Sequence, residues 1–219
     1  RRLTFSSAMR LDEKETKKRR AMKNTRGWVI AFGVLLVLGL GACRMRPHAF
    51  HGTLIQSPDP VPDFTLLGHM GQPVSLSDFR GQLVVLYFGY TVCPDVCPTT
   101  LAVLHRAREA LGQNADQVQV LMVTVDPERD TTEVLADYVT HFDPTFIGLT
   151  GTADEIAAVA TYYGIFYERR EEADSALGYL VDHTATQMVI DREGHLKVVF
   201  PLGAEAEDIA ADLEYMITH

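Results

Sequence analysis

Two cysteines, Cys93 and Cys97, are the residues of this 219-residue chain whose type and spacing most clearly allow chemistry. Three residues separate them, and a proline follows each. A continuous apolar run over residues 83–90 precedes the pair and predicts a strand buried on both faces. A helix is predicted over residues 99–111, so the pair lies at a strand–helix junction. Such junctions are the usual site of chemistry in open α/β sheets, and a helix N-terminus stabilises a thiolate.

The residues of the pair leave three kinds of site open. A disulfide would close a very short loop and would remove little chain entropy. A thiol–disulfide oxidoreductase typically carries two residues between its cysteines, whereas this chain carries three. A metal site would use both thiolates as soft ligands for Cu(I) or Zn(II), and it would need a third ligand, commonly histidine.

His183, in the segment YLVDHTATQMV, is the candidate for that third ligand. It lies where a loop enters a predicted buried strand, a place where a solvent-facing side chain is not required. On its residue type alone it is equally an ordinary polar residue. The other seven histidines are expected at solvated positions, namely His48, His51, His69, His105, His141, His195 and His219.

Residues 1–42 are predicted to be a leader outside the fold. Lys23 and Arg26 precede an uncharged apolar stretch over residues 28–42. That stretch is shorter than the roughly 17–25 residues of a membrane-spanning helix and suits the h-region of a signal peptide. The highly charged residues 1–21 are interpreted as an over-extended start.

Residues 40–43, LGAC, resemble a bacterial lipoprotein box in which Cys43 becomes the lipidated first residue. An uncleaved N-terminal anchor and simple secretion are the alternatives, and all three place the domain outside the inner membrane. Residues 43–62 are proline-rich and predict a tether, which leaves residues 63–219 as the domain. With Cys43 assigned to the leader, the cysteine pair holds the only thiols of that domain.

Charge is unevenly distributed along the chain. The first 42 residues hold ten Lys/Arg and three Asp/Glu, which leaves ten basic and 26 acidic side chains for the rest. So acidic a body excludes binding to nucleic acid or to an anionic membrane through bulk charge. The chain also has no glycine-rich phosphate loop and no serine nucleophile elbow.

The order of apolar segments predicts an α/β fold, with a mixed central sheet flanked by helices and an N-terminal hairpin turning at residues 68–71. Residues 179–191 and 195–203 are predicted to be two paired strands, and residues 168–178 an irregular exposed insertion. Further predictions are a strand over 118–126, helices opening at the capping boxes Asp130–Glu133 and Thr152–Glu155, and a helix over 209–217.

Over residues 63–216 the chain resembles the Sco/SenC family of copper-binding thioredoxin-like proteins. The segments that carry the resemblance are DFTL, GQLVVLYFGYTVCPDVCPTTL, VTVDPERDTTEVLADYV and YLVDHTATQMVIDREG, in that order. The resemblance implies a thioredoxin-like fold in which Cys93, Cys97 and His183 bind one copper ion. Thr184 follows the histidine where many relatives have serine, a mild change that leaves the ligand set intact.

The resemblance also implies a function, the maturation of the CuA centre in subunit II of cytochrome c oxidase. The chain would deliver copper as a metallochaperone rather than as an enzyme with turnover, or it would act as a thiol–disulfide reductase on that subunit. A peroxide-reducing enzyme is disfavoured because the domain has no further cysteine. Two thiolates and an imidazole suit Cu(I) and tolerate Cu(II). Asp182 either orients His183 from behind or is an ordinary polar residue at a strand end.

The expected location is the cell envelope, with the N-terminus attached to the membrane and the domain on the extracytoplasmic side. The copper source and the reductant of the cysteines are implied as further partners, and the sequence identifies neither.

Overall fold

The computed structural model describes residues 48–171 and 178–219. The predicted leader over residues 1–42 and Cys43 therefore lie outside the described residues. No described helix is long and apolar enough to cross a membrane.

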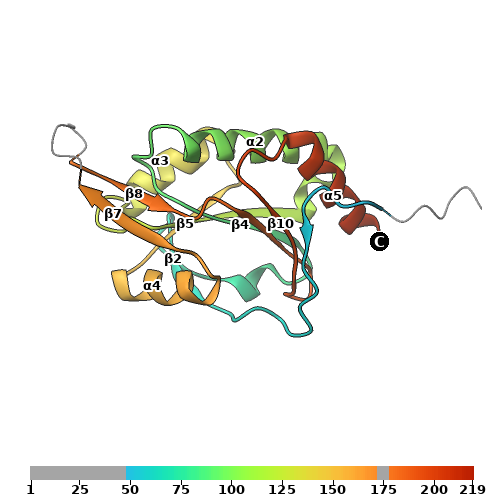
Figure 1. Cartoon of the computed structure of the whole chain (residues 1–219), viewed down its shortest axis with the longest axis horizontal. Helices are drawn as coiled ribbons and strands as arrows, with labels where there is room; N and C mark the ends of the chain where they lie inside the picture. The colour runs from blue at the N-terminus through green and yellow to red at the C-terminus, as the bar shows by residue number, and fades with distance from the viewer. Residues whose placement is uncertain (1–47, 172–177) are drawn as a thin grey trace, which may run out of the picture. The chain divides into compact units, whose positions relative to one another are not determined.

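An eight-stranded mixed sheet forms the centre of the described domain, with helices on both sides (Figure 1). Its strand order is β1-β10-β9-β4-β5-β6-β2-β3, in which β4, β5 and β6 are parallel and the other pairs antiparallel. The predicted mixed α/β fold is thereby confirmed. The strands are β1 Thr53–Leu54, β2 Thr65–Gly68, β3 Pro73–Ser75, β4 Leu83–Gly89, β5 Val118–Thr124, β6 Ile147–Thr150, β9 Gln187–Ile190 and β10 Leu196–Phe200.

Strands β4 and β5 form the middle of the sheet because their residues are apolar on both faces. All seven residues of β4 are buried, and β4 pairs in parallel with β5 from Leu83↔Val118 to Gly89↔Thr124. Two parallel strands in this register end at the same edge of the sheet. The loop that carries the cysteines and the loop that follows β5 are therefore neighbours.

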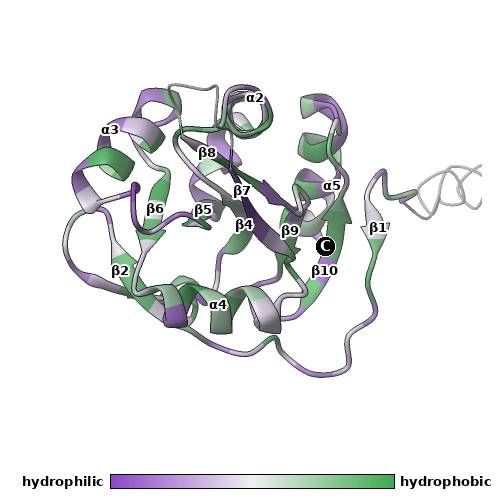
Figure 2. Cartoon of the chain, turned by 60° about the vertical axis from the view of Figure 1, so that its left-hand side comes forward, coloured by the Kyte–Doolittle hydropathy of each residue, from purple (hydrophilic) through white to green (hydrophobic). Residues whose placement is uncertain are grey.

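Helices cover the two faces of the sheet unequally. In two views, α2, α3 and α5 lie on one side of the strands and α4 on the other, while hydrophobic residues colour much of the central strands (Figure 2). The helices are α2 Val96–Ala110, α3 Thr132–Phe142, α4 Ala153–Tyr162 and α5 Ala206–Thr218, with 3-10 turns η1 Leu76–Phe79 and η2 Gly112–Gln117.

The capping predictions had mixed outcomes. Thr152 and Glu155 form the predicted capping box at the start of α4. The prediction at Asp130 was wrong, because Thr131 is the N-cap of α3 and accepts from Val134 N–H. Asp130 is instead fully buried and binds groups on other segments.

The segment that carries His183 differs from the prediction. The single strand expected over residues 179–191 is two strands, β8 Tyr179–His183 and β9, which belong to different sheets. Strand β8 pairs antiparallel with β7, Tyr167–Glu171, so part of the predicted irregular insertion is a strand. Residues 172–177, the remainder of that insertion, lie outside the described part of the chain.

The N-terminal part of the described chain packs on the sheet. Strands β2 and β3 form the predicted hairpin, and Gly71 in its turn has φ +77°, which glycine adopts without strain. Residues 48–62, predicted as tether, contain β1, which pairs with β10. The buried carboxylate of Asp212 on α5 accepts hydrogen bonds from the backbone N–H groups of His51 and Gly52 at 2.9 and 3.0 Å.

Candidate metal centre

The cysteine loop connects the end of β4 to the start of α2. Cys97 lies in the first turn of α2, as predicted, and is fully buried, whereas Cys93 is half-buried in the loop. Both are free thiols. Asp95 is at the N-cap but its side chain forms no capping hydrogen bond. Instead, the backbone N–H of Cys97 donates to Cys93 Sγ at 3.4 Å. The sulfur is therefore the acceptor for one of the N–H groups that have no partner within the helix.

The two thiols differ in acidity because one donates a hydrogen bond to the other. The Cys97 thiol donates to Cys93, and the backbone N–H groups of Asp95 and Cys97 add further hydrogen bonds. Together they hold the pKa of Cys93 well below its ordinary value, although burial opposes the shift. The same hydrogen bond, with burial, raises the pKa of Cys97. Cys93 is therefore the thiolate and the nucleophile of the pair.

This asymmetry predicts the order and pH dependence of alkylation in the metal-free, reduced protein. Between pH 8 and pH 6 an ordinary thiol loses about 75-fold in thiolate and in rate, whereas the rate at Cys93 should hardly change because its pKa is lowered. Iodoacetamide at pH 6, followed by peptide mass spectrometry, should find modification at Cys93 before Cys97. The Cys93→Ser variant is the control, and a rate for Cys93 that falls like that of a free thiol would contradict the prediction.

His183 is the last residue of β8, and the fold brings it to the cysteines across 86 residues of sequence. Its Nε2 lies 3.4 Å from Cys97 Sγ, and its Nδ1 lies 3.1 Å from the carbonyl oxygen of Thr184. A proton on Nδ1 donated to that carbonyl leaves Nε2 as an acceptor or metal ligand. The rings of Tyr87 and Tyr90 pack edge-on against the imidazole, with centroid distances of 6.3 and 5.8 Å.

Asp182 is exposed and points to a different neighbour. Its Oδ2 lies 3.5 Å from Arg170 Nε, and no described contact joins its carboxylate to His183. The hydrogen bond that orients the His183 ring is therefore made by the carbonyl of Thr184 and not by Asp182.

Gly89 and Tyr87 border the buried sulfur. A Cβ at Gly89 would lie 3.1 Å from Cys97 Sγ and 2.7 Å from Tyr87 Cε1, so the missing side chain makes room for the thiol. The Tyr87 hydroxyl is buried, and burial together with the nearby Cys97 raises its pKa. Tyr87 therefore stays a neutral phenol beside the pair.

A cavity of about 280 Å³ lies between the cysteine loop and the end of β8. Cys93 and His183 line it together with apolar side chains such as Leu180 and Leu202. Within the described part of the chain, no group of three His, Cys, Asp or Glu side chains has a geometry that could hold a metal ion. Cys97 contacts both Cys93 and His183, so the three side chains lie together but do not converge on one point.

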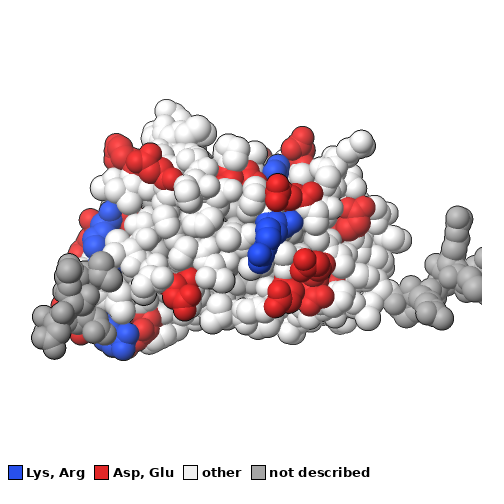
Figure 3. Space-filling view, turned by 90° about the horizontal axis from the view of Figure 1, so that it is seen from above, with Lys and Arg blue, Asp and Glu red and all other residues white. Residues whose placement is uncertain are grey.

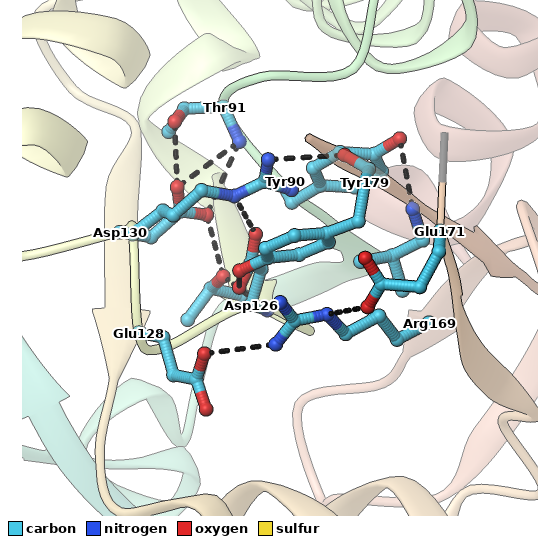
Figure 4. Close-up of polar contacts among 11 residues, drawn as sticks. Tyr90, Thr91, Asp126, Glu128, Asp130, Arg169, Glu171 and Tyr179 are labelled. Atoms are coloured by element: carbon cyan, nitrogen blue, oxygen red, sulfur yellow. Dashed lines mark hydrogen bonds and ion pairs between the residues drawn. The ribbon is translucent and has the colours of Figure 1, made fainter. Parts of the chain in front are cut away.

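Sequence reasoning missed the buried carboxylates of the loop after β5. The sequence predicts Asp126 only as the end of a strand and Asp130 as a helix cap. In the structure Asp126 and Asp130 are both buried, and they bind the segments that carry His183 and Cys93 (Figure 4). The available signal was two carboxylates directly after a buried strand, where the carboxyl ends of strands gather functional groups.

The fold and the cysteine loop at the carboxyl end of β4 define the class as a thioredoxin-like protein. The thioredoxin domain of a thiol-disulfide oxidoreductase from Bacteroides vulgatus shares this fold, with a TM-score of 0.54 at 17% identity.

The chain belongs to the SCO1/SenC family, whose family model matches residues 53–218. This finding confirms the family predicted from the sequence. A SCO2-like protein of Rickettsia prowazekii is 37% identical over 146 residues, which cover 67% of this chain and 71% of the relative. The mitochondrial SCO2 homolog of Bos taurus is 40% identical over 149 residues, which cover 67% of this chain and 56% of the relative.

Solved structures of Sco proteins superpose on most of the chain. ScoI of Arabidopsis thaliana with copper bound has a TM-score of 0.68 at 33% identity, covering 73% of this chain and 99% of that one. Apo Sco1 of Thermus thermophilus has a TM-score of 0.68 at 44% identity, covering 77% and 97%.

Proposed function

We propose that this chain is a copper metallochaperone that binds one copper ion through Cys93, Cys97 and His183. The observation that supports it most directly is the 3.4 Å approach of His183 Nε2 to Cys97 Sγ, next to a second free thiol. Two thiolates and an imidazole are a donor set suited to copper. The copper-bound ScoI structures from Arabidopsis thaliana and Bradyrhizobium japonicum support the choice of metal.

Binding requires the three donors to converge. Cys93 is half-buried in a loop and its sulfur contacts the start of α2, so a small movement of that loop would bring it toward the other two. Both cysteines bind a metal as thiolates. Because Cys93 is already a thiolate, loading releases the proton of Cys97. A site with three protein donors leaves room for a thiol of an acceptor protein, which is the requirement for transfer.

The acceptor that we propose is the CuA domain of cytochrome c oxidase subunit II. The domain would act on the extracytoplasmic side of the membrane, attached through its N-terminal segment, with lipidation of Cys43 as the proposed anchor. On the face drawn in Figure 3, Asp and Glu are more frequent than Lys and Arg, which disfavours nucleic acid as a partner.

A second function, reduction of the disulfide in the CuA site, is favoured by the lowered pKa of Cys93. Its thiolate would attack the substrate disulfide, and Cys97 would then resolve the mixed disulfide. Two electrons and the Cys97 proton pass to the substrate, solvent supplies the second proton, and a Cys93–Cys97 disulfide is left behind.

One set of measurements separates the two functions. The reduced protein should bind about one copper per chain. The protein oxidised to the Cys93–Cys97 disulfide should retain none, because cysteine binds a metal only as a thiolate and His183 alone is one ligand. Metal content after desalting measures both. Failure of the reduced wild type to retain copper would refute the metallochaperone. Metal-free reduction of an oxidised CuA-site peptide, dependent on both cysteines and unaffected by His183→Ala, would support the reductase.

A further inference from the structure

His183 is carried by a hairpin that stands apart from the main sheet. Strands β7 and β8 pair only with each other among the described residues, from Tyr167↔His183 to Glu171↔Tyr179. Backbone hydrogen bonds of the eight-stranded sheet therefore do not set the position of β8. Besides the short connection over residues 184–186 to β9, contacts from elsewhere in the domain place its last residue near the cysteines. One of them is the hydrogen bond from Val181 N–H to the Tyr90 hydroxyl at 3.2 Å.

Tyr179, at the other end of β8, makes the densest of these contacts (Figure 4). Its hydroxyl donates to Asp126 Oδ1 at 2.8 Å. Its ring lies between two guanidinium groups, with Arg129 Cζ 3.6 Å and Arg169 Cζ 3.5 Å from the ring centroid. Cations at that distance from an aromatic face attract it, so the ring is held on both sides.

The groups that hold Tyr179 are themselves fixed. Arg129 Nε donates to the buried Asp126 carboxylate, and Arg129 Nη1 donates to the carbonyl oxygen of Tyr179 at 3.1 Å. Arg169 pairs with Glu128 Oε2 at 3.1 Å. Tyr179 is thus bound at its ring, its hydroxyl and its carbonyl by the loop that follows β5.

The same loop also holds the cysteine segment. The Asp130 carboxylate accepts from the backbone N–H of Thr91 at 3.1 Å and from its hydroxyl at 2.5 Å, two residues before Cys93. Asp130 N–H donates to the carbonyl of Asp126 at 3.0 Å, which fixes the two carboxylates relative to each other. One short loop therefore forms hydrogen bonds to both segments that carry the proposed ligands.

We propose that Asp126, Arg129 and Asp130 form a clamp that sets the distance between His183 and the cysteine pair, with Tyr179 as the positioning residue of the histidine. This inference rests on the proposed function of the same site and adds the means by which its donors are brought into range. Because Tyr179 lies on β8, loosening the Tyr179 end of the clamp should weaken copper binding only through His183.

Variants at Tyr179 test the clamp. Tyr179→Leu removes the ring and the hydroxyl, and Cu(II) affinity should fall about tenfold, the lower end of the effect of residues that orient metal ligands. Tyr179→Phe keeps the ring between the guanidinium groups and should give a smaller loss. The nitrogen hyperfine pattern in the Cu(II) electron paramagnetic resonance spectrum should change in parallel. Tyr163→Phe is the matched control, since it removes a tyrosine hydrogen bond to the Pro62 carbonyl, and it should change neither.

A second background separates positioning from general damage. In a His183→Ala protein, Tyr179→Leu should cause no further loss of affinity, because the residue acts through the histidine. An equal loss in both backgrounds, or no loss in either, would overturn the proposal. Arg169→Gln, at a half-exposed position, removes the guanidinium from one face of the Tyr179 ring with little risk to folding and should weaken binding in the same direction.

A metal-free measurement keeps this test independent of copper. The imidazole signals of His183 in nitrogen-edited magnetic resonance spectra should shift in Tyr179→Leu and stay in place in Tyr163→Phe. Unchanged His183 signals would overturn the clamp even if copper binds. If the wild type binds no copper but Tyr179→Leu still shifts the His183 signals, only the proposed function is refuted and the clamp stands.

Discussion

His183→Ala should lower the affinity for Cu(II) more than about 100-fold, because removing a ligand exceeds the 10–100-fold effect of removing a group that only orients one. The loss should be smaller for Cu(I), since soft thiolates favour Cu(I) and two of them remain. Competition with chelators of known affinity, in each oxidation state and with the thiols kept reduced, measures both losses.

The controls for this variant come from the same chain. His141→Ala changes an exposed histidine on α3 and should leave copper binding unchanged. In His183→Ala the two cysteines should still react with a thiol reagent, because the cysteine loop is held by its own contacts. If His183→Ala binds Cu(II) as tightly as the wild type, the proposed ligand set is wrong.

Asp130→Ala should destabilise the domain by about 3 kcal/mol, since it strips buried donors of their acceptor, and each unsatisfied buried group costs about 1–3 kcal/mol. The donors are the Thr91 N–H, the Thr91 hydroxyl and the Thr124 hydroxyl, the last at 2.5 Å. Urea unfolding followed by circular dichroism measures the loss. An unfolding free energy within about 0.5 kcal/mol of wild type would contradict it.

Asp130→Asn supplies the matched control and a pH test. Its amide oxygen can still accept from Thr91 N–H, so the loss should be smaller. Burial, the largest influence, raises the pKa of Asp130 in the folded protein. A raised folded-state pKa gives stability that is complete below the unfolded pKa, about 3.9, and is lost as the pH rises through the folded pKa. The wild type should therefore be more stable relative to Asp130→Asn at pH 4 than at pH 7. The reverse order would show that Asp130 is stabilised as a carboxylate.

The sequence by itself determined the elements with strong local signals. The apolar runs at β4 and β5 are long enough to be strands buried on both faces, and both form as predicted. The cysteine pair falls at the junction that its neighbours in sequence define, with Cys97 in the first turn of α2. The capping box at Thr152 and Glu155 needs only four residues in a row, so local chemistry was sufficient.

Predictions failed where a residue's role depends on a distant partner. The pattern at Asp130 and Glu133 satisfies the rule for a helix start, but Asp130 is instead required by Thr91, 39 residues earlier in the chain. The segment that carries His183 is predicted as one strand with apolar residues at both ends, yet it divides between two sheets. Which strand pairs with which is a non-local property, and periodicity cannot report it.

Residue types and motifs alone singled out the proposed copper ligands, Cys93, Cys97 and His183, and the family to which the chain belongs. Only the tertiary structure decided how the parts meet. It placed His183 Nε2 3.4 Å from Cys97 Sγ and gave Nδ1 to the Thr184 carbonyl rather than to Asp182. The physical reason is that parallel β4 and β5 end at one edge of the sheet. That edge puts two buried carboxylates between segments that are far apart in the sequence, and their hydrogen bonds fix both segments.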